Sequence, residues 1–379
     1  MTSNALKRSV QYFLGTGPCH VKPFARIAAT RVCEFSLPIH RPEYHAGVVA
    51  AVPPDSVFST ESFSLLGQQA EPELVAGTRR YRSAGLLASL PRELWLLDDA
   101  AVAGAEGAVW CPRTRTLVAE TAHHWFHGAS EHPLLAAPRF PDPSPLTGLT
   151  LHLGALNAEG YFHFLHESLP KLALARPWLP HVSHILANGQ PGGFQEKWLR
   201  LAGVDPKRIL WLNGLSHFRC EQLLFTRSFA LDLCPSPWIV AQLRDLFPTV
   251  AACGSRRLWI TRRATGRRHL AWEEQLLAML PDFECVDLAA LEPAAQIALM
   301  ASSSVVAGPI GAGFSNIVFC SPGARVIIIR PSLQQYPLYD RLATAAGLAH
   351  SWLAADFLQP VDISRISAAI TEWIGRSGR

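Results

Sequence analysis

The stretch "VVAGPIGAGFSNIVF", residues 305–319, decides the fold of the C-terminal part of the chain. An apolar run is followed by glycines at 308, 311 and 313 and then by the polar pair Ser315 and Asn316. This order predicts a strand, a tight turn and a helix that begins near Ser315. Backbone N–H groups at a helix N-terminus bind anions, and glycines allow a phosphate to approach the backbone closely. The two polar residues are expected to cap the helix or to bind the ligand.

The glycine turn differs from the two commonest nucleotide motifs. No G-K-[ST] follows the glycines, so the stretch is not a P-loop, and "GPIGAG" has the wrong spacing for a dinucleotide fingerprint. A strand-to-helix turn that is tight only for packing reasons fits the same residues. The stretch alone therefore predicts either an anion site or a structural turn.

Helix and strand patterns alternate outward from this turn in both directions. Strands are expected at 256–263, 283–288, 304–308 and 324–331 with helices between them, and a similar alternation covers 160–214. Such alternation favours parallel strand pairing, so the fold class is predicted to be α/β. Residues 1 to about 145 are rich in proline, glycine and short β-type runs, and they are expected to form irregular strands and loops.

The length of 379 residues predicts two domains, because a single core usually stops growing at ~250–300 residues. The boundary is expected near residue 236, which gives domains of 1–235 and 236–379. A hydrophobic content of 49% with 17% charged residues is typical of a compact globular enzyme. A net charge of +4 is too small to predict nucleic-acid binding.

The eight cysteines form no C-x-x-C pair, so they are interpreted as reduced packing residues, which favours a cytoplasmic location. No apolar run is long enough for a signal peptide or for the ~18–20 residues of a membrane span. The sequence is compatible with peripheral membrane contact through an amphipathic surface. It does not determine the oligomeric state. The histidines of "HHWFH" at 123–127 are interpreted as loop or fold histidines.

The segment "SRRLWITRRATGRRHLAWEE", residues 255–274, concentrates arginines at the end of a predicted strand. A planar guanidinium group binds phosphate oxygens in pairs, and a diphosphate would use one or two of these side chains. Arg262 and Arg268 are the preferred candidates. The alternative is a solvated strand end that binds nothing.

The segment "NAEGYFHFLHESLPKL", residues 157–172, places His163 and Glu167 four residues apart on one face of a predicted helix. An imidazole and a carboxylate at this spacing can orient each other for general-base catalysis. "HFLHE" is not H-E-x-x-H and no third ligand stands nearby, so no metal site is predicted. The alternative is a histidine packed against the core with a glutamate on the surface.

In this order, the motifs resemble those of the family 61 glycosyltransferases. That family has a histidine helix of the form N-x-x-H-x-x-x-[DE], then an arginine strand, then a "GxHGAGxxN" turn. The chain matches these motifs at His163 and Glu167, at Arg262, Arg268 and Glu273, and at Gly308, Gly311, Ala312, Gly313 and Asn316. "FCSPGARVIII" at 319–329 matches the continuation, and the resemblance covers about residues 150–335. The chain departs from the family at Trp272, Ile310 and Ile328, where the family usually has asparagine, histidine and an acidic residue.

The resemblance implies two Rossmann-like domains that face a cleft, as in GT-B enzymes. It implies an inverting transfer of a sugar from a nucleotide diphosphate donor to a glycan or lipid-linked saccharide, with neither a metal ion nor a further cofactor. The implied donor site comprises the matched residues of the second domain together with Ser315, and residues 1–235 form the acceptor side. His163 and Glu167 share the base and orienting roles, and capsule or surface polysaccharide assembly is the implied setting.

Two other classes of function stay open from the residues. A non-catalytic glycan- or nucleotide-binding protein of the same fold would bind a nucleotide without hydrolysing a donor. A dinucleotide-dependent oxidoreductase would use the glycine turn for its cofactor, but the acidic ribose partner expected after such a turn is missing.

Overall fold

The structure is a computed structural model that describes residues 20–22, 48–52, 92–122, 132–136, 141–227, 235–249, 254–331 and 338–375. The described residues up to Arg227 belong to one compact unit and those from Pro235 belong to a second. The histidines at 123–127 and the cysteines at 19, 33, 234 and 253 lie outside the described residues. Within the described ranges, no helix is long and apolar enough to cross a membrane.

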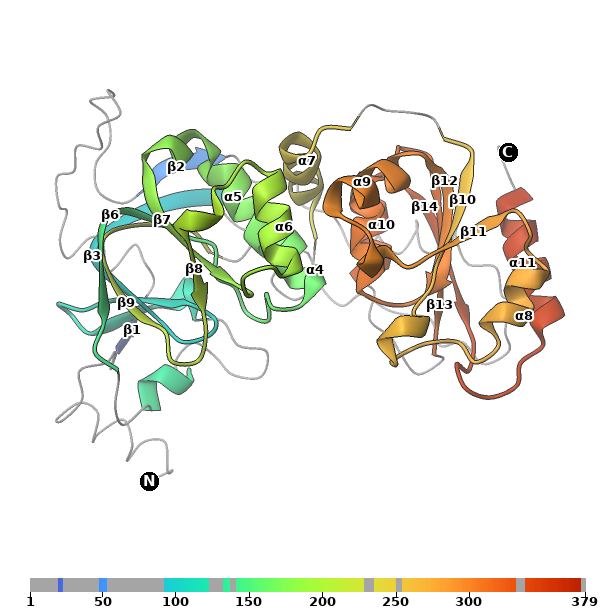
Figure 1. The fold of residues 1–379 in the computed structure, drawn as a ribbon, viewed down its shortest axis with the longest axis horizontal. Coiled ribbons are helices and arrows are strands. Elements are labelled where there is room, and N and C mark those ends of the chain that lie inside the picture. The colour runs from blue at the N-terminus through green and yellow to red at the C-terminus, as the bar shows by residue number, and fades with distance from the viewer. Residues whose placement is uncertain are drawn as a thin grey trace. The chain divides into compact units, whose positions relative to one another are not determined.

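The first unit is built on a nine-stranded mixed sheet (Figure 1). Its main strand order is β1-β5-β4-β3-β9-β6-β7-β8, and β2 pairs with β3. The strands are β1 (His20–Lys22), β2 (Val48–Val52), β3 (Arg92–Ala103), β4 (Ala108–Cys111), β5 (Thr116–Val118), β6 (Ser144–His152), β7 (Val182–Asn188), β8 (Ile209–Leu212) and β9 (His217–Phe225). The helices are α4 (Tyr161–His163), α5 (Leu169–Ala175) and α6 (Phe194–Leu201).

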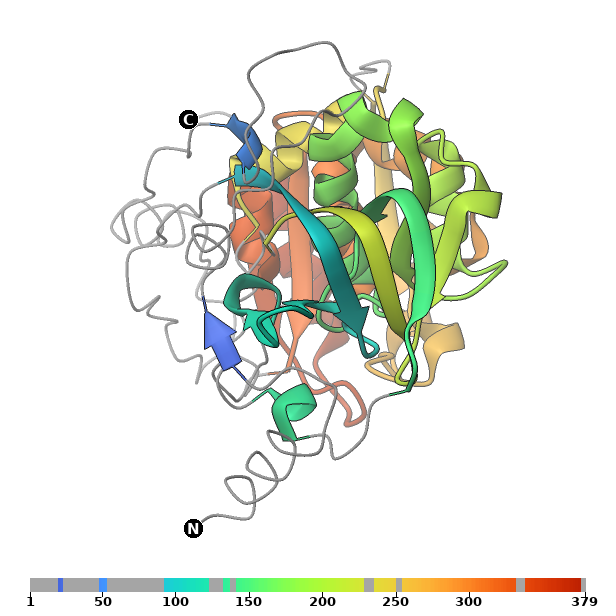
Figure 2. The ribbon, with the colours of Figure 1, turned by 90° about the vertical axis from the view of Figure 1, so that its left-hand side faces the viewer.

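The β-rich region and the α/β segment of the first unit share this one sheet. Strands β6, β7, β8 and β9 pair in parallel, whereas β3 pairs antiparallel with β9. Figure 2 shows β3 in teal beside β9 in yellow-green. Buried side chains from every strand from β3 to β9 form one apolar cluster, so this sheet encloses a common core. The strand expected in this region is present as β3, which is twelve residues long and has a positive φ of 50° at Asp99.

The second unit is a five-stranded parallel sheet with the order β11-β10-β12-β13-β14. The strands are β10 (Arg256–Ile260), β11 (Phe283–Val286), β12 (Ser303–Pro309), β13 (Arg325–Arg330) and β14 (Ala349–Ala354). The helices are α7 (Pro237–Leu246), α8 (Glu273–Ala278), α9 (Pro293–Ala301), α10 (Leu338–Ala345) and α11 (Ile363–Gly375). Helices α9 and α10 cover one face of the sheet, and α8 and α11 cover the other (Figure 1).

Strands β10, β12 and β13 are apolar without alternation because both faces of this sheet are covered. Leu258, Trp259 and Ile260 are buried in succession, as are all residues from Val326 to Arg330. The predicted strands and helices of residues 256–331 are therefore confirmed in order and type. One exception lies after the glycines, where the chain forms a 3₁₀ helix, η10 (Ala312–Phe319), that begins before Ser315.

Gly308 is the point where β12 approaches β10 most closely. Its φ is +150°, and a Cβ atom there would lie 2.5 Å from the Ile260 carbonyl oxygen. Backbone cannot yield as a flexible side chain does, so we expect Gly308→Ala to lower the free energy of unfolding by about 2–4 kcal/mol. Chemical denaturation measures this change.

Gly375→Ala is the matched control for Gly308→Ala. A Cβ atom at Gly375 meets nothing within 4 Å, so the free energy of unfolding should stay within about 1 kcal/mol of the original value. Equal stabilities of the two variants would contradict the close approach of β12 to β10.

Three of the described cysteines fit the predicted packing role. Cys111, Cys220 and Cys320 are free and buried. Burial raises the pKa of the thiols of Cys220 and Cys320 to about 12, so both stay protonated at neutral pH. Cys285 is free but exposed, so the prediction of a packing role is wrong for that residue.

Candidate functional site

The strand order of the second unit creates a topological switch point between β10 and β12. The chain leaves β10 toward β11 on one side, and after β11 it returns to β12 on the other side. In open parallel sheets, ligands bind outside the carboxyl ends of the two strands at such a point. The arginine segment follows β10 and the glycine turn follows β12, so both predicted anion-binding segments lie at the switch point.

Arg262 and Gly311 are brought together at this edge. A Cβ atom on Gly311 would lie 1.9 Å from Nη1 and 2.5 Å from Cζ of Arg262. The φ of Gly311 is 179°, which any residue adopts, so the glycine is required for space and not for conformation. Sequence reasoning expected the glycine to make room for a phosphate. Instead, the space at Gly311 receives the guanidinium group.

Arg262 carries a positive charge that no carboxylate neutralises within the described residues. Its Nε donates to the carbonyl oxygen of Arg267 at 3.1 Å, and the side chain is partly buried. Burial, followed by the nearby charge of Arg268, lowers the pKa of Arg262, and Tyr339 acts in the opposite direction. An anion bound here would relieve the repulsion between the two guanidinium groups.

Three other arginines of the same segment are ion-paired. Arg257 pairs with Asp282 at 3.0 Å and Arg256 with Glu284 at 3.6 Å, while Arg263 contacts Glu273 and Glu274. Within residues 254–331 and 338–375, Arg262 and Arg268 form no such pair. These two arginines are thus the ones with charge available to a ligand, together with the exposed Arg267.

Glu273 supports the strand end and is not open to solvent. It is 2% exposed, its Oε1 accepts from Trp259 Nε1 at 2.6 Å, and its Oε2 accepts from Thr261 Oγ1 at 2.7 Å and from Arg263 Nε at 2.5 Å. Both oxygens are therefore engaged within the second unit. Glu273 thus binds Thr261 and Arg263, the residues on either side of Arg262.

We expect Glu273→Gln to lower the free energy of unfolding by about 1–3 kcal/mol, because the amide nitrogen would face a buried donor. Glu274→Gln is the control, since the Glu274 side chain is 82% exposed and pairs with Arg263 at the surface. Thermal denaturation of the two variants measures the difference. A midpoint for Glu273→Gln equal to that of the control would contradict this supporting role.

The polar pair after the glycines is buried and does not cap the 3₁₀ helix. Gly311 occupies the N-cap position without a side-chain cap, so the predicted capping role is wrong. Asn316 donates its amide to Gln296 Oε1 at 3.1 Å and to the Gly313 carbonyl at 3.3 Å. Ser315 is fully buried near the Tyr339 hydroxyl. Burial raises the pKa of Tyr339 to about 12, whereas Ser315, Arg262 and Arg268 act to lower it. Tyr339 lies on α10, and no motif in the sequence pointed to it.

The histidine helix of the first unit contains an irregular turn where the predicted base lies. His163 ends α4, and a π-helical turn, η4 (Phe164–Ser168), contains Glu167. His163 Nδ1 and Glu167 Oε1 are 3.7 Å apart. Insertions of this kind occur frequently at functional sites. Glu167 is 4% exposed, so the alternative of a surface glutamate is wrong.

The loop between β6 and α4 is fixed by buried polar groups that sequence reasoning missed. Asn188, at the end of β7, accepts from Ala155 N at 2.9 Å and donates to Glu159 Oε1 at 3.3 Å. Lys171 Nζ donates to the Gly154 carbonyl at 2.5 Å. The signal for Lys171 was its position four residues after Glu167. Within the described residues, no three His, Cys, Asp or Glu side chains converge as a metal site.

The histidine helix, the arginine segment and the glycine turn lie within a stretch of sequence that matches a known protein family. Residues 161–327 match the family model of Glycosyltransferase 61. The resemblance to the family 61 glycosyltransferases is therefore confirmed over these residues. A search of the curated proteins finds no match.

The family 61 segment contains the histidine helix, the arginine segment and the glycine turn, whereas Tyr339 lies beyond it. All three residues that depart from the family pattern are buried, with Ile310 at 3%, Trp272 at 4% and Ile328 at 2% exposure. Ile310 N donates to the Ile329 carbonyl, and Trp272 Nε1 donates to the Asp356 carbonyl at 2.9 Å. These side chains serve the core of the second unit.

Proposed function

We propose that the protein is an inverting glycosyltransferase that moves a hexosyl or pentosyl group from a nucleotide diphosphate donor to a glycan or lipid-linked saccharide. The observation that supports this most is the guanidinium group of Arg262 seated over Gly311 at the switch point of the parallel sheet. The proposal assigns the donor to the second unit and proton abstraction to the first. This agrees with the GT-B arrangement that the resemblance implies.

The diphosphate is the natural occupant of the arginine and glycine site. Arg262 and Arg268 offer two positive charges to the diphosphate. The 3₁₀ helix η10 begins after its N-cap Gly311, so its first backbone N–H groups are additional donors for an anion. As the sugar–phosphate bond breaks, negative charge grows on the leaving diphosphate, and these groups stabilise it in place of a metal ion. Arg262 is the proposed principal contact, and Glu273 keeps its loop in position.

His163 is the proposed general base, with Glu167 as its orienting partner. Glu167 lies beside Nδ1, which leaves Nε2 as the nitrogen that takes the proton. The acceptor hydroxyl loses its proton to Nε2, its oxygen attacks the anomeric carbon, and the diphosphate leaves from the opposite face. The configuration at that carbon is thereby inverted.

A screen of nucleotide sugars tests this function. Binding and donor hydrolysis are measured for UDP-, GDP-, TDP-, CMP- and ADP-sugars, and product stereochemistry is read by NMR for each donor that turns over. We expect a diphosphate donor to bind and to be hydrolysed slowly without acceptor. Binding without turnover would favour the non-catalytic alternative, and absence of nucleotide binding would refute both. A cytoplasmic role in polysaccharide assembly is part of the same proposal.

A further inference from the structure

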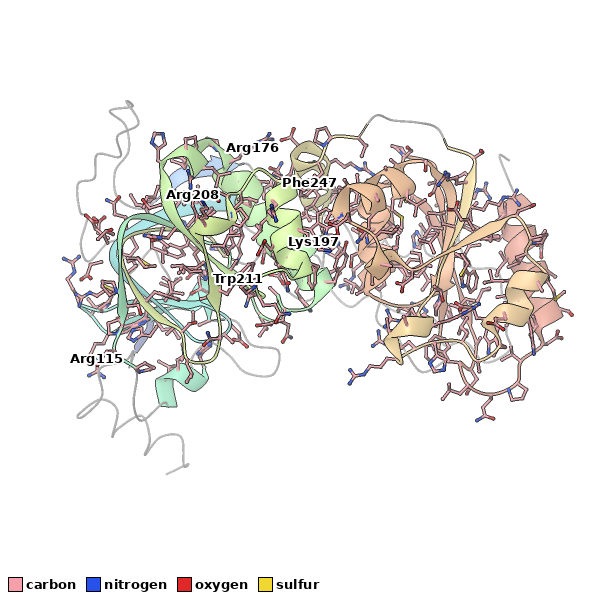
Figure 3. All side chains as sticks on the ribbon, viewed as in Figure 1. Arg115, Arg176, Lys197, Arg208, Trp211 and Phe247 are labelled. Atoms are coloured by element: carbon pink, nitrogen blue, oxygen red, sulfur yellow. The ribbon has the colours of Figure 1, made fainter. Side chains whose placement is uncertain are left out.

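Lys171 is a buried charge that the proposed mechanism does not use. It lies on α5 in the first unit, eight residues after His163 and four after Glu167, and it is 2% exposed. Lysine is almost never this deeply buried unless a partner compensates its charge. By contrast, Lys197 on the neighbouring helix α6 is exposed (Figure 3).

The ammonium group joins the helix to the loop that precedes it. Nζ donates to the carbonyl oxygen of Gly154, the second residue after β6. That loop has no free space, because a Cβ atom on Gly154 would lie 2.7 Å from His152 Nε2 and 2.7 Å from a Leu212 methyl carbon. Lys171 therefore holds the backbone of a closely packed loop against the helix that carries His163.

Two titratable groups in the described part of the chain face Lys171. Glu167, on the preceding turn, raises the pKa of the lysine in opposition to burial. His152, on β6, is fully buried, and burial followed by the charge of Lys171 lowers its pKa well below the usual value, so this imidazole is neutral at neutral pH. Glu167 is thus the acidic group whose charge acts on Lys171, at a distance longer than that of a direct ion pair.

The Glu167 carboxylate needs such a cation. Its Oε1 faces His163 Nδ1, whereas its Oε2 is buried and accepts no hydrogen bond from the described residues. A carboxylate in this state is costly to keep charged without a nearby positive group. Glu167 Oε1 lies 3.7 Å from His163 Nδ1, which is beyond hydrogen-bond distance, and the negative charge of the carboxylate favours the tautomer with the proton on Nδ1 and Nε2 unprotonated.

We propose that Lys171 is a positioning residue for the base, which balances the charge of the Glu167 carboxylate four residues earlier and holds the loop at Gly154 in place so that His163 presents Nε2 to the acceptor. This inference rests on the proposed function. It assigns a role to a residue that touches neither donor nor acceptor. The proposed role requires a positive charge at position 171, so an apolar side chain of equal length is not sufficient.

The pKa of Lys171 gives the proposal a pH signature. Burial lowers this pKa from 10.5 to about 8, so the ammonium is charged at neutral pH and loses its proton as the pH rises through about 8. Activity should therefore fall above about pH 8. An arginine at the same position stays charged and should move that decline upward by at least one pH unit.

The test compares the original protein with Lys171→Arg and Lys171→Met. We expect kcat of Lys171→Met to fall at least 10-fold at pH 7 with an unchanged KM for the donor, whereas Lys171→Arg retains most activity and shifts the alkaline limb. Lys197→Met is the matched surface control and should match the original protein. An alkaline limb at the same pH in Lys171→Arg, or full activity in Lys171→Met, would overturn the proposal.

A measurement without substrate separates this inference from the proposed function. The ¹⁵N shifts of the His163 ring report which nitrogen carries the proton, and we expect the Nδ1–H form in the original protein and in Lys171→Arg. A mixture of the two tautomers is expected in Lys171→Met. The same mixture in the original protein would refute the positioning role even if the enzyme is active. The expected tautomers with no donor turnover would refute the proposed function alone.

The folded state of each variant is checked by the pH dependence of unfolding. Because burial lowers the pKa of Lys171, the unfolded chain binds more protons between about pH 8 and 10.5, so the original protein should gain stability as the pH rises through this window. Lys171→Met should lack that gain. An equal gain in Lys171→Met would mean that Lys171 is not the buried group, and the proposal would fall with it.

Discussion

Replacing Arg262 by methionine is expected to weaken nucleoside diphosphate binding about 10–100-fold, the usual effect of losing one charge-assisted contact to phosphate. The reason is specific to this side chain. Its guanidinium group occupies the space at Gly311, Arg268 is its charged neighbour, and no carboxylate among the described residues pairs with it, so a bound anion would compensate its positive charge. Isothermal titration with UDP and GDP measures the loss.

Arg257→Met is the control for this prediction. Arg257 lies on β10, the strand that precedes Arg262, but its guanidinium group already pairs with Asp282 at 3.0 Å near the surface. Nucleotide affinity should be unchanged in this variant. Equal losses in the two variants would mean that the segment binds through its overall charge and not through a site at the switch point.

Gly311→Ala examines the same site without removing a charge. The new methyl group would displace the Arg262 guanidinium, which is the movable end of a long side chain, so nucleotide affinity should fall while stability changes little. Retained affinity would show that Arg262 need not lie over the glycine turn in order to bind a phosphate.

Replacing His163 by alanine is expected to lower kcat by about 100–10 000-fold, the range for loss of a general base. The KM for the donor should change little, because the proposed donor contacts belong to the second unit. Initial rates with the donor found in the screen measure this effect. Donor turnover by the variant at the original rate would exclude His163 as the base.

His181→Ala is the matched control for His163→Ala. His181 lies in the same unit after α5 and is exposed. Its replacement should leave kcat unchanged. The kcat of Glu167→Gln should lie between those of His163→Ala and His181→Ala, because glutamine keeps the shape of the orienting residue and removes its charge.

The local patterns predicted the second unit well and the first unit only in part. Strands buried on both faces, such as Val326–Arg330, have an unambiguous sequence pattern, and alternation with helices implies parallel pairing. The pairing of β3 with β9 joins residues far apart in the sequence, such as Trp95 with Phe225, which are 130 positions apart. No local pattern carries that information, so the shared sheet of the first unit was not foreseen.

The candidate site shows the same division. The spacing of His163 and Glu167 and the arginine segment were visible in the sequence, because each depends on residue type and local order. The burial of Glu167 and the compensating charge of Lys171 could not be predicted from the sequence, because burial depends on how the loop at Gly154 packs against β6. The role of Gly311 was also misassigned, because its neighbour is a side chain 49 positions earlier in the chain.

The position of β10 between β11 and β12 has a consequence for biosynthesis. This strand emerges first among the five of its sheet, yet one of its two neighbours, β12, ends only at Pro309. During translation, β10 has one neighbour missing until some 50 further residues have left the ribosome, and non-local pairing of this kind is slow. A nascent chain halted before Ser303 should therefore expose β10 to chaperones, whereas one extended past Arg330 should protect it.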